Sequence, residues 1–306
     1  MKLLRRAIQG ETDLRQMSVL VHDFPDDNTH LVDLPYRFSS WALDDPSNVA
    51  LWFDGSGQLR AWAVLQTPFW AVDYAYHPLE GGILFTEILA WADLRAREAG
   101  TGTYGRPMWF YNVFRDQLER IQALEEAGFA NLESSEQDPW SKVLLVNSLT
   151  SPTPHSYLPD HFVLRPLAGE DEVGGYVDLH RMVFETKNMT GAWRRRVLQR
   201  PEYLPDLDLV VVAPDGRLVA FCVGWFDPQG SLGKPCGQIE PLGVHPDFRN
   251  LGLGWSILME ALRRLQAHGA DQVYVETDTY RDAAYHLYRS AGFQVKRDII
   301  VFGKNY

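Results

Sequence analysis

Cysteine is scarce in this chain: of 306 residues only Cys222 and Cys236 are cysteines, and neither belongs to a Cys-x-x-Cys pair or a Cys/His cluster. We therefore expect no disulfide framework and no metal site, and a reducing cytoplasm as the compartment. Apolar runs are short as well, since none approaches the roughly 20 residues that cross a bilayer. Residues 1–6 lack the apolar core of a signal peptide. These absences predict a cytoplasmic protein with no membrane partner.

Basic residues are also in deficit: 29 Lys and Arg face 40 Asp and Glu, which gives a formal net charge of −11. Because nucleic acid is bound by basic surfaces, it is not expected as a partner. A basic run, Trp193-Arg194-Arg195-Arg196, is interpreted as a solvated helix face. Hydrophobic residues (45%) and charged residues (23%) occur in the proportions of a globular protein, and the length suits two domains.

Residues 245–254 form the most informative segment, His-Pro-Asp-Phe-Arg-Asn-Leu-Gly-Leu-Gly. An apolar run at 239–244 precedes it, and an amphipathic helical pattern follows from Leu253. Gly252 and Gly254 let backbone N–H groups approach an anion closely, the helix N-terminus adds positive dipole, and Arg249 adds a fixed charge. The arrangement predicts a phosphate-binding loop.

Two other interpretations of this loop stay open. Gly252-x-Gly254 before a helix could begin a dinucleotide fingerprint. Against it, the third glycine of that motif would fall at Ile257, and Pro246 stands among the residues that separate the apolar run from the first glycine. The loop could also be an ordinary turn between a strand and a helix, with no ligand.

A second motif follows at residues 281–293, Arg-Asp-Ala-Ala-Tyr-His-Leu-Tyr-Arg-Ser-Ala-Gly-Phe. Ala284, Leu287, Tyr288 and Ala291 share one helical face, and Gly292 stands where a helix C-cap belongs. Alone, this pattern indicates only an amphipathic helix.

Together the two motifs resemble those of the GNAT superfamily of acyl-CoA N-acyltransferases. The first matches its Arg-x-x-Gly-x-Gly pyrophosphate loop, and the second matches Asn-x-x-Ala-x-x-Leu-Tyr-x-x-x-Gly-Phe except that Arg281 replaces the asparagine. The resemblance implies an acetyltransferase that uses acetyl-CoA, without a metal, to acetylate a primary amine of a small molecule or peptide. It also implies that acetyl-CoA contacts Leu242, Gly243, Val244, Arg249, Asn250, Leu251, Gly252, Leu253, Gly254, Trp255, Arg281 and Ala284.

Candidate catalytic residues follow from the same resemblance. Tyr288 matches the family's general acid, and the ordinary pKa of tyrosine, about 10, suits delivery of a proton to a leaving thiolate. Two carboxylates compete for the role of general base: Glu240 within the apolar run, and Glu276, which is expected to end the next strand. Pro241 predicts a bulge that re-aims Glu240, so Glu240 is favoured.

The chain also repeats itself. Leu4-Arg5, Gly10-Glu11, Gly57-Gln58-Leu59, His77-Pro78 and Gly128-Phe129 recur in the same order as Leu164-Arg165, Gly169-Glu170, Gly216-Arg217-Leu218, His245-Pro246 and Gly292-Phe293. The repeat predicts domains at 1–150 and 161–306 joined by a Pro-rich linker at 151–160. Paired strands are expected at 49–53 with 59–66, and at 209–213 with 218–226.

The predicted fold class is mixed α+β and α/β: two tandem GNAT-like domains, each a mostly antiparallel mixed sheet flanked by helices. By resemblance, strands four and five of each domain splay apart to admit the cofactor.

The two halves differ at the motifs. The loop after His77 is three residues shorter than the loop after His245, lacks the arginine and carries Glu80, while Glu125 is placed opposite Leu287-Tyr288. Because a carboxylate repels a pyrophosphate, the N-terminal half is predicted not to bind acetyl-CoA. A different possibility is a non-catalytic acyl-CoA sensor or scaffold whose N-terminal repeat binds a partner. The expected oligomeric state is a monomer or homodimer.

Overall fold

The computed structural model describes residues 3–99, 108–136, 139–150, 153, 157–231, 233–279 and 282–306. Two sequence-based predictions therefore lie partly or wholly outside the described residues. Arg281 is one, and residues 151, 152 and 154–156 of the expected linker are the other.

The described residues form thirteen strands and eight α-helices. The strands are β1 (Leu4–Ala7), β2 (Val49–Phe53), β3 (Leu59–Gln66), β4 (Ala71–Tyr76), β5 (Met108–Phe114), β6 (Ala130–Asn131), β7 (Ser141–Ser148), β8 (Val163–Pro166), β9 (Asp208–Val212), β10 (Leu218–Ser231), β11 (Lys234–Val244), β12 (Gln272–Asp278) and β13 (Gln294–Asn305). The helices are α1 (Glu11–Asp23), α2 (Leu34–Phe38), α3 (Gly81–Ala99), α4 (Leu118–Glu126), α5 (Val173–Phe184), α6 (Gly191–Leu198), α7 (Leu253–Ala267) and α8 (Asp282–Ser290).

All thirteen strands join one continuous mixed sheet. Its order is β1-β2-β3-β4-β5-β13-β7-β12-β11-β10-β9-β8, with β6 paired to β13 off this path. The predicted hairpin strands at 49–53 and 59–66 are confirmed to the residue as β2 and β3. Within each half the first strands are antiparallel, and β4 with β5 and β11 with β12 are the parallel pairs.

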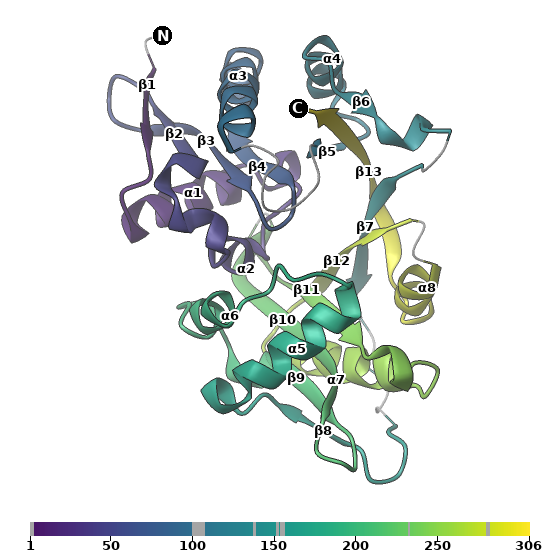
Figure 1. The fold of residues 1–306 in the computed structure, drawn as a ribbon. Coiled ribbons are helices and arrows are strands. Elements are labelled where there is room, and N and C mark those ends of the chain that lie inside the picture. Colours follow the sequence, from purple (N-terminus) through teal and green to yellow (C-terminus); the bar gives the residue numbers. More distant parts are fainter. Residues whose placement is uncertain are drawn as a thin grey trace.

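The two halves exchange strands at their junction. Strand β13, the last of the chain, pairs with β5 of the N-terminal half, whereas β7 of the N-terminal half pairs with β12 of the C-terminal half. In Figure 1 the C-terminus accordingly lies among N-terminal elements, and β7 runs down beside β12. Sequence reasoning did not predict the exchange, because both strands have ordinary alternating patterns that carry no information about their partner.

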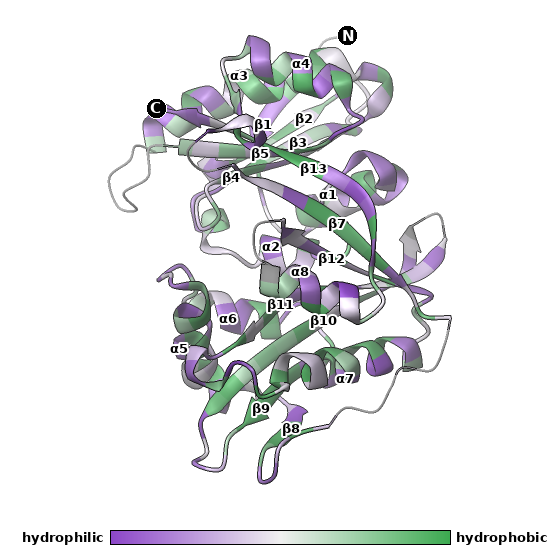
Figure 2. Ribbon diagram, turned by 90° about the vertical axis from the view of Figure 1, so that its right-hand side faces the viewer, coloured by the Kyte–Doolittle hydropathy of each residue, from purple (hydrophilic) through white to green (hydrophobic). Residues whose placement is uncertain are grey.

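Each half is a sheet with helices on both faces. In the N-terminal half α1 and α2 bury one face, and α3 and α4 bury the other. In the C-terminal half α5 and α6 cover one face and α7 the other. The hydrophobic clusters cross the exchange, because Phe302 of β13 packs in the α3 cluster and Leu145 of β7 packs in the α7 cluster. In Figure 2 the strands are largely apolar, and the helices on either side carry both apolar and polar residues.

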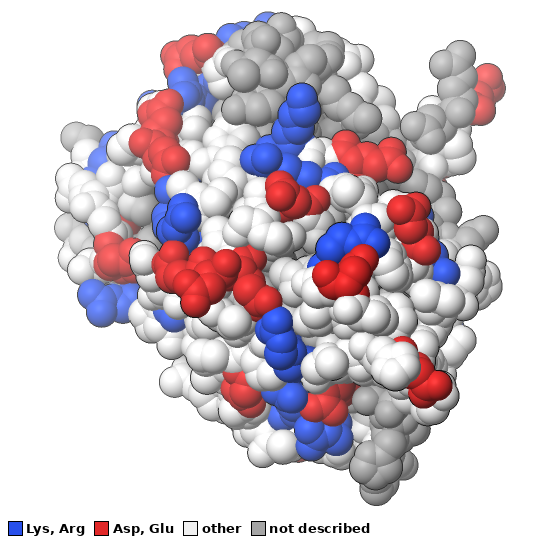
Figure 3. All heavy atoms as spheres, turned by 60° about the horizontal axis from the view of Figure 1, so that its bottom comes forward, with Lys and Arg blue, Asp and Glu red and all other residues white. Residues whose placement is uncertain are grey.

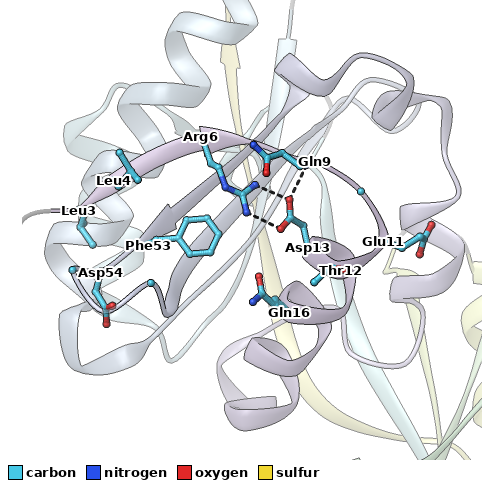
Figure 4. Close-up of a pocket in the computed structure, with 13 residues that line it drawn as sticks. Leu3, Leu4, Arg6, Gln9, Glu11, Thr12, Asp13, Gln16, Phe53 and Asp54 are labelled. Carbon is cyan, nitrogen blue, oxygen red and sulfur yellow. Dashed lines mark hydrogen bonds and ion pairs between the residues drawn. The ribbon is translucent and has the colours of Figure 1, made fainter.

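A repeated ion pair fastens the first strand of each half to the helix that follows. Arg6 donates to both oxygens of Asp13 at 2.6 and 2.8 Å, and the Gln9 N–H also donates to Asp13 (Figure 4). Arg165 makes the matching bidentate pair with Glu172, whose carboxylate also accepts the N–H of Ala168.

This repeated pair locates the repeat more closely than the sequence did. Arg165 corresponds to Arg6, not to Arg5 as the Leu-Arg landmark suggested. Phe53 and Asp13 also line the groove beside Arg6. We interpret Arg6 in this groove as part of the structural ion pair that occurs in both halves.

The surface mixes both signs of charge. On the face in Figure 3, acidic and basic side chains alternate among the described residues, and no basic patch extends across it. Within the described part of the chain, no helix is long and apolar enough to cross a membrane. The described residues also contain no cluster of His, Cys, Asp and Glu that could hold a metal ion. The side chains of Cys222 and Cys236 are both buried.

Candidate functional site

The site begins where β11 and β12 separate. The two strands pair in parallel only from Cys236–Gln272 to Gln238–Tyr274. Beyond Gln238, β11 remains paired with β10 and β12 with β7, so a gap opens between them. This is the splay expected between the fourth and fifth strands.

A bulge in β11 lies at the mouth of the splay. Cys222 of β10 faces Leu242 and Gly224 faces Ile239, so Val223 alone stands opposite Glu240 and Pro241. The bulge predicted from Pro241 is therefore confirmed. Because an extra residue redirects the side chains next to it, Ile239, Glu240, Pro241 and Leu242 all reach the same cavity.

That cavity measures about 330 Å³ and lies between the two halves. Helix α2 and the segment before it, from the N-terminal half, form one wall, and β11, β12 and α8 form the other. Its lining includes every candidate catalytic residue and, from the N-terminal half, several groups that the sequence did not suggest. The charged and titratable lining residues are His30, Asp33, Tyr36, Arg37, Lys142, His180, Glu240, Glu276, Asp278 and Tyr288.

Glu240 is poised to exchange a proton near neutrality. Burial and the nearby carboxylates Asp33 and Glu276 raise the pKa of its carboxyl, Arg37 and Lys142 oppose the rise, and the resulting pKa is about 7. No hydrogen bond from a described residue to its carboxylate is recorded; its backbone carbonyl accepts the indole N–H of Trp225 at 2.8 Å. A carboxylate with this pKa is a competent general base at physiological pH.

Glu276 is placed differently from the sequence-based expectation. It does not end its strand, because β12 continues to Asp278, and its side chain is not solvated. Lys142 donates to its Oε1 at 2.7 Å. Burial would raise the pKa of Glu276, but Lys142 and His30 outweigh it and bring the pKa to about 2. Glu276 is therefore ionised at neutral pH.

Tyr288 lies on α8 with its ring in the core and its edge on the cavity. It is buried, packs against Phe293 at a centroid distance of 5.6 Å, and belongs to the hydrophobic cluster beneath α7. Burial, with the nearby Cys222 and Glu240, raises the pKa of its phenol, so the hydroxyl is protonated at neutral pH. A protonated phenol in this position can serve as a general acid.

The predicted phosphate loop has the geometry of an anion site. Gly252, at φ +78°, is the N-cap of α7, and Asn250 also has a positive φ of 64°. The first helical bond runs from Ser256 N–H to Gly252 O, so the N–H groups of residues 253–255 have no acceptor within the helix. Arg249 is exposed beside them. A phosphate is well matched to this set of donors.

The adjoining segments pack closely around the splay. A Cβ on Gly243 would lie 2.6 Å from the side chains of both Phe221 and Val183, so no larger residue fits there. Gly254 places α7 against Val244 of β11 and Leu287 of α8, with a Cβ position 3.4 and 3.5 Å from them. Leu242 and Ala284 line the cavity. Val244 and Gly254 thus connect the predicted phosphate loop to the splay.

The corresponding region of the N-terminal half is filled. Tyr74, Tyr76 and Tyr111 pack with Phe85 there, with ring centroids 5.1 to 6.3 Å apart. Arg120, which lies eight residues before Gly128 as Ala284 does before Gly292, is buried over the faces of Tyr74 and Tyr76.

The other N-terminal landmarks agree with this filling. Glu80 pairs with Arg60 at 2.8 Å at the start of α3. Counted back from Gly128, the residue in the place of Tyr288 is Leu124, fully buried, and not Glu125.

Sequence reasoning missed the residues that reach the cavity from the N-terminal half. Arg37 donates from Nε and a terminal nitrogen to Asp73, both at 2.6 Å, and Lys142 arrives on the exchanged strand β7. No local motif marks them, because their role depends on how the halves meet.

The prediction of a solvated face at 193–196 holds for the exposed Arg195 but is wrong for Trp193 and Arg194, for the same reason. Arg194 is wholly buried and paired with Asp208, and Trp193 is buried between the halves against Tyr36.

Comparisons with known proteins agree with this geometry. Residues 176–293 match the model of the acetyltransferase (GNAT) family. A mycothiol acetyltransferase from Thermobispora bispora is 30% identical over 152 residues, which cover 47% of this chain and 50% of the relative. One from Arthrobacter sp. is 30% identical over 146 residues, covering 46% and 45%. The chain thus spans about half the length of the curated relatives it matches.

Solved structures extend the similarity to the whole chain. A GCN5-related N-acetyltransferase from Sphaerobacter thermophilus superposes with a TM-score of 0.67 at 18% identity, covering 99% of this chain and 95% of that one. A tandem GNAT protein from the clavulanic acid biosynthesis pathway gives 0.67 at 12% identity, covering 99% and 98%.

The chain therefore has the fold of a tandem GNAT protein. Residues 176–293 resemble the acetyltransferase (GNAT) family, and the relatives named above are mycothiol acetyltransferases.

Proposed function

We propose that this protein is an N-acetyltransferase that moves an acetyl group from acetyl-CoA to a primary amine of a small molecule or peptide. The observation that carries the proposal is the meeting of Glu240 and Tyr288 on one cavity at the splay between β11 and β12. Catalysis of the transfer is assigned to a C-terminal domain, residues 161–306. Residues 1–150 are assigned to a degenerate repeat and 151–160 to the linker.

The residues present fit acetyl-CoA. The free N–H groups at the start of α7, with Arg249, would hold the pyrophosphate, and the edge of Leu242 to Val244 would lie along the pantetheine arm. Ala284 leaves room beside that arm. When bound, acetyl-CoA supplies the acyl carbon as a thioester.

The side chains of Glu240 and Tyr288 then carry out the proton transfers. Glu240 takes a proton from the acceptor ammonium, which frees the nitrogen lone pair to form the N–C bond. Tyr288 gives its phenolic proton to the sulfur as the C–S bond breaks. Two protons leave the nitrogen in all: one passes through Glu240 to solvent, and the other replaces the proton that Tyr288 gave up. The products are the amide and the free thiol.

The cavity favours a small cationic acceptor. Its volume of about 330 Å³ lies at the lower end of the range of small-molecule sites. Asp33, Glu240, Glu276 and Asp278 line it against the cations Arg37 and Lys142, so carboxylates are in excess. A protonated amine is attracted to such a lining.

The proposal is tested by thiol release from acetyl-CoA on a panel of amino sugars, polyamines, amino acids and peptides. At least one amine is expected to stimulate release, and Tyr288→Phe is expected to lower kcat by about 100-fold with KM for the amine little changed. Tyr157→Phe, at an exposed tyrosine outside the site, is the matched control. Binding of acetyl-CoA without thiol release on any amine would instead favour a sensor or scaffold.

A further inference from the structure

The exchanged strand β7 brings a lysine to the site. Lys142 is the second residue of β7, directly across from Asp278 of β12 and diagonal to Glu276, which faces Leu144. Diagonal neighbours on one face of a sheet lie within reach of a long side chain. The ammonium reaches Glu276 at 2.7 Å, and the side chains of Lys142 and Glu276 are 21% and 11% exposed. Nothing in the C-terminal half's own sequence supplies this cation.

The ion pair fixes one oxygen of Glu276 and leaves the other buried. Oε1 accepts from Lys142, whereas Oε2 has no hydrogen-bond partner among the described residues. Removal of the lysine would leave the carboxylate buried and uncompensated, which is costly. Lys142 itself is held in its charged form, because Glu276 and Asp278 raise its pKa against the effect of burial.

Glu240 faces this pair across the cavity. The charged groups that act on it are the carboxylates Asp33 and Glu276 and the cations Arg37 and Lys142. The phenols of Tyr36, Tyr176 and Tyr288 also interact with it electrostatically. Of the two glutamates, Glu276 has a cation in direct contact, whereas no contact of that kind is recorded for Glu240 within the described chain.

We propose that Lys142 and Glu276 form a positioning pair for Glu240: Lys142 keeps Glu276 fixed and ionised, so that Glu240 alone takes the proton from the acceptor. The role of base taken by Glu240 rests on the proposed function, whereas the coupling between the two glutamates does not. An ionised Glu276 repels a second negative charge nearby and so makes Glu240 hold its proton more strongly than it otherwise would. Glu276 itself is unable to compete for that proton while Lys142 is bound to it.

Two variants distinguish this arrangement from one in which Glu276 is the base and from one in which the pair has no effect on Glu240. Glu276→Gln removes the repelling charge and leaves Lys142 unpaired, so Glu240 is expected to lose its proton at lower pH. The acid limb of the pH profile of kcat/KM should persist and move down by at least one pH unit. The double variant Lys142→Met/Glu276→Gln also removes the cation, and its limb should move back up by at least half a unit from the single variant. Asp178→Asn, at an exposed carboxylate of α5, should leave the profile unchanged.

A second readout does not depend on turnover. Carbon-13 NMR of protein labelled at the glutamate carboxyl carbons should show one carboxyl that titrates near pH 7 and is absent from Glu240→Gln. The same signal should titrate at least one unit lower in Glu276→Gln. If no amine is acetylated but this shift occurs, the proposed function fails and the coupling stands.

Two results would overturn the positioning role. Loss of the acid limb in Glu276→Gln, with a large fall in rate at every pH, would make Glu276 the base. A limb and an NMR titration unmoved in both variants would show that the pair does not act on Glu240.

Discussion

The two halves carry a carboxylate at the same place in the sheet, with opposite environments. Val64 and Val223 both lie seven residues beyond the glycine of their hairpin turn, Gly57 and Gly216. Asp73 of β4 faces Val64, and the Glu240 bulge of β11 faces Val223. Asp73 is held by Arg37, whereas Glu240 has no cation in direct contact recorded among the described residues.

The consequence appears in the proton affinities. Burial acts on both carboxyls, but Arg37 and His30 reverse its effect and lower the pKa of Asp73, whereas burial with Asp33 and Glu276 raises the pKa of Glu240 to about 7. In the N-terminal half Tyr74, Tyr76 and Arg120 fill the region that corresponds to the splay, whereas the splay beside Glu240 is open. One scaffold has thus produced a sealed site and an open one.

The largest expected effect comes from breaking the ion pair between Arg37 and Asp73. Arg37→Met should lower the free energy of unfolding by about 3–5 kcal/mol, because it removes the two-bond partner of the buried Asp73 carboxylate. Urea unfolding measures it. The neutral double variant Arg37→Met/Asp73→Asn should recover most of the loss, and a cost below about 1 kcal/mol for the single variant would contradict the pairing.

Glu240→Gln tests the open site. The rate constant kcat/KM should fall by about 100-fold or more, and the acid limb near pH 7 should disappear. A limb that survives the substitution would remove Glu240 from the role of base.

Glu240→Gln should lower the rate but raise the stability of the folded protein at high pH. The folded-state pKa of Glu240 lies above its unfolded value, so the folded protein binds this proton more tightly and loses stability as pH rises from about 4.5 to 7. Glu240→Gln should therefore be more stable than the wild type at pH 8, by about 1–3 kcal/mol, and similar to it below pH 5.

A third substitution places an arginine in the open splay, at the position that Arg120 occupies in the filled one. Ala284→Arg places the counterpart of Arg120 in the open splay and should weaken CoA binding at least about tenfold, a loss of about 1.4 kcal/mol. Ala283→Arg, at the exposed neighbour, should leave binding unchanged. Calorimetry on the wild type should give one equivalent of CoA per chain, and two equivalents would refute the filled N-terminal site.

The smallest effect concerns the contact between the halves. His22 of α1 pairs with Asp227 of β10 at 2.6 Å, and this hydrogen bond raises the pKa of His22 above that of a free histidine. The pair therefore stabilises the fold at low pH and is lost as pH rises through the raised pKa. His22→Gln should cost about 1 kcal/mol in urea unfolding near pH 5.5 and less near pH 9. His286→Gln, at an exposed histidine, is the control, and an equal cost at both pH values would rule out the ion pair.

Much of the geometry of the C-terminal site could be predicted, because the residues proposed to contact the cofactor lie within short segments. The loop around Gly252 and the face carrying Ala284 and Tyr288 are local patterns fixed by backbone conformation and helical spacing. The bulge at Glu240 was predictable from Pro241 for the same reason.

What the sequence did not reveal depends on contacts between distant segments. Lys142 lies 134 residues from Glu276, and only the exchange of β7 brings them together. Arg194 appeared solvated because its partner Asp208 begins a different element. Glu276 was expected to end its strand, because the sequence around it does not indicate that Lys142 compensates for the burial of its carboxylate.

The exchange of β7 and β13 also determines the order in which the two halves can complete their folding during synthesis. The N-terminal sheet needs Gln294–Asn305 beside β5, yet these residues are synthesised long after β5 itself. Domains of a growing chain usually fold as units, the N-terminal one first. Here the first half must wait with an open strand edge, so we expect it to be the half that relies on chaperones, and a chain that stops before β13 to fail as a whole.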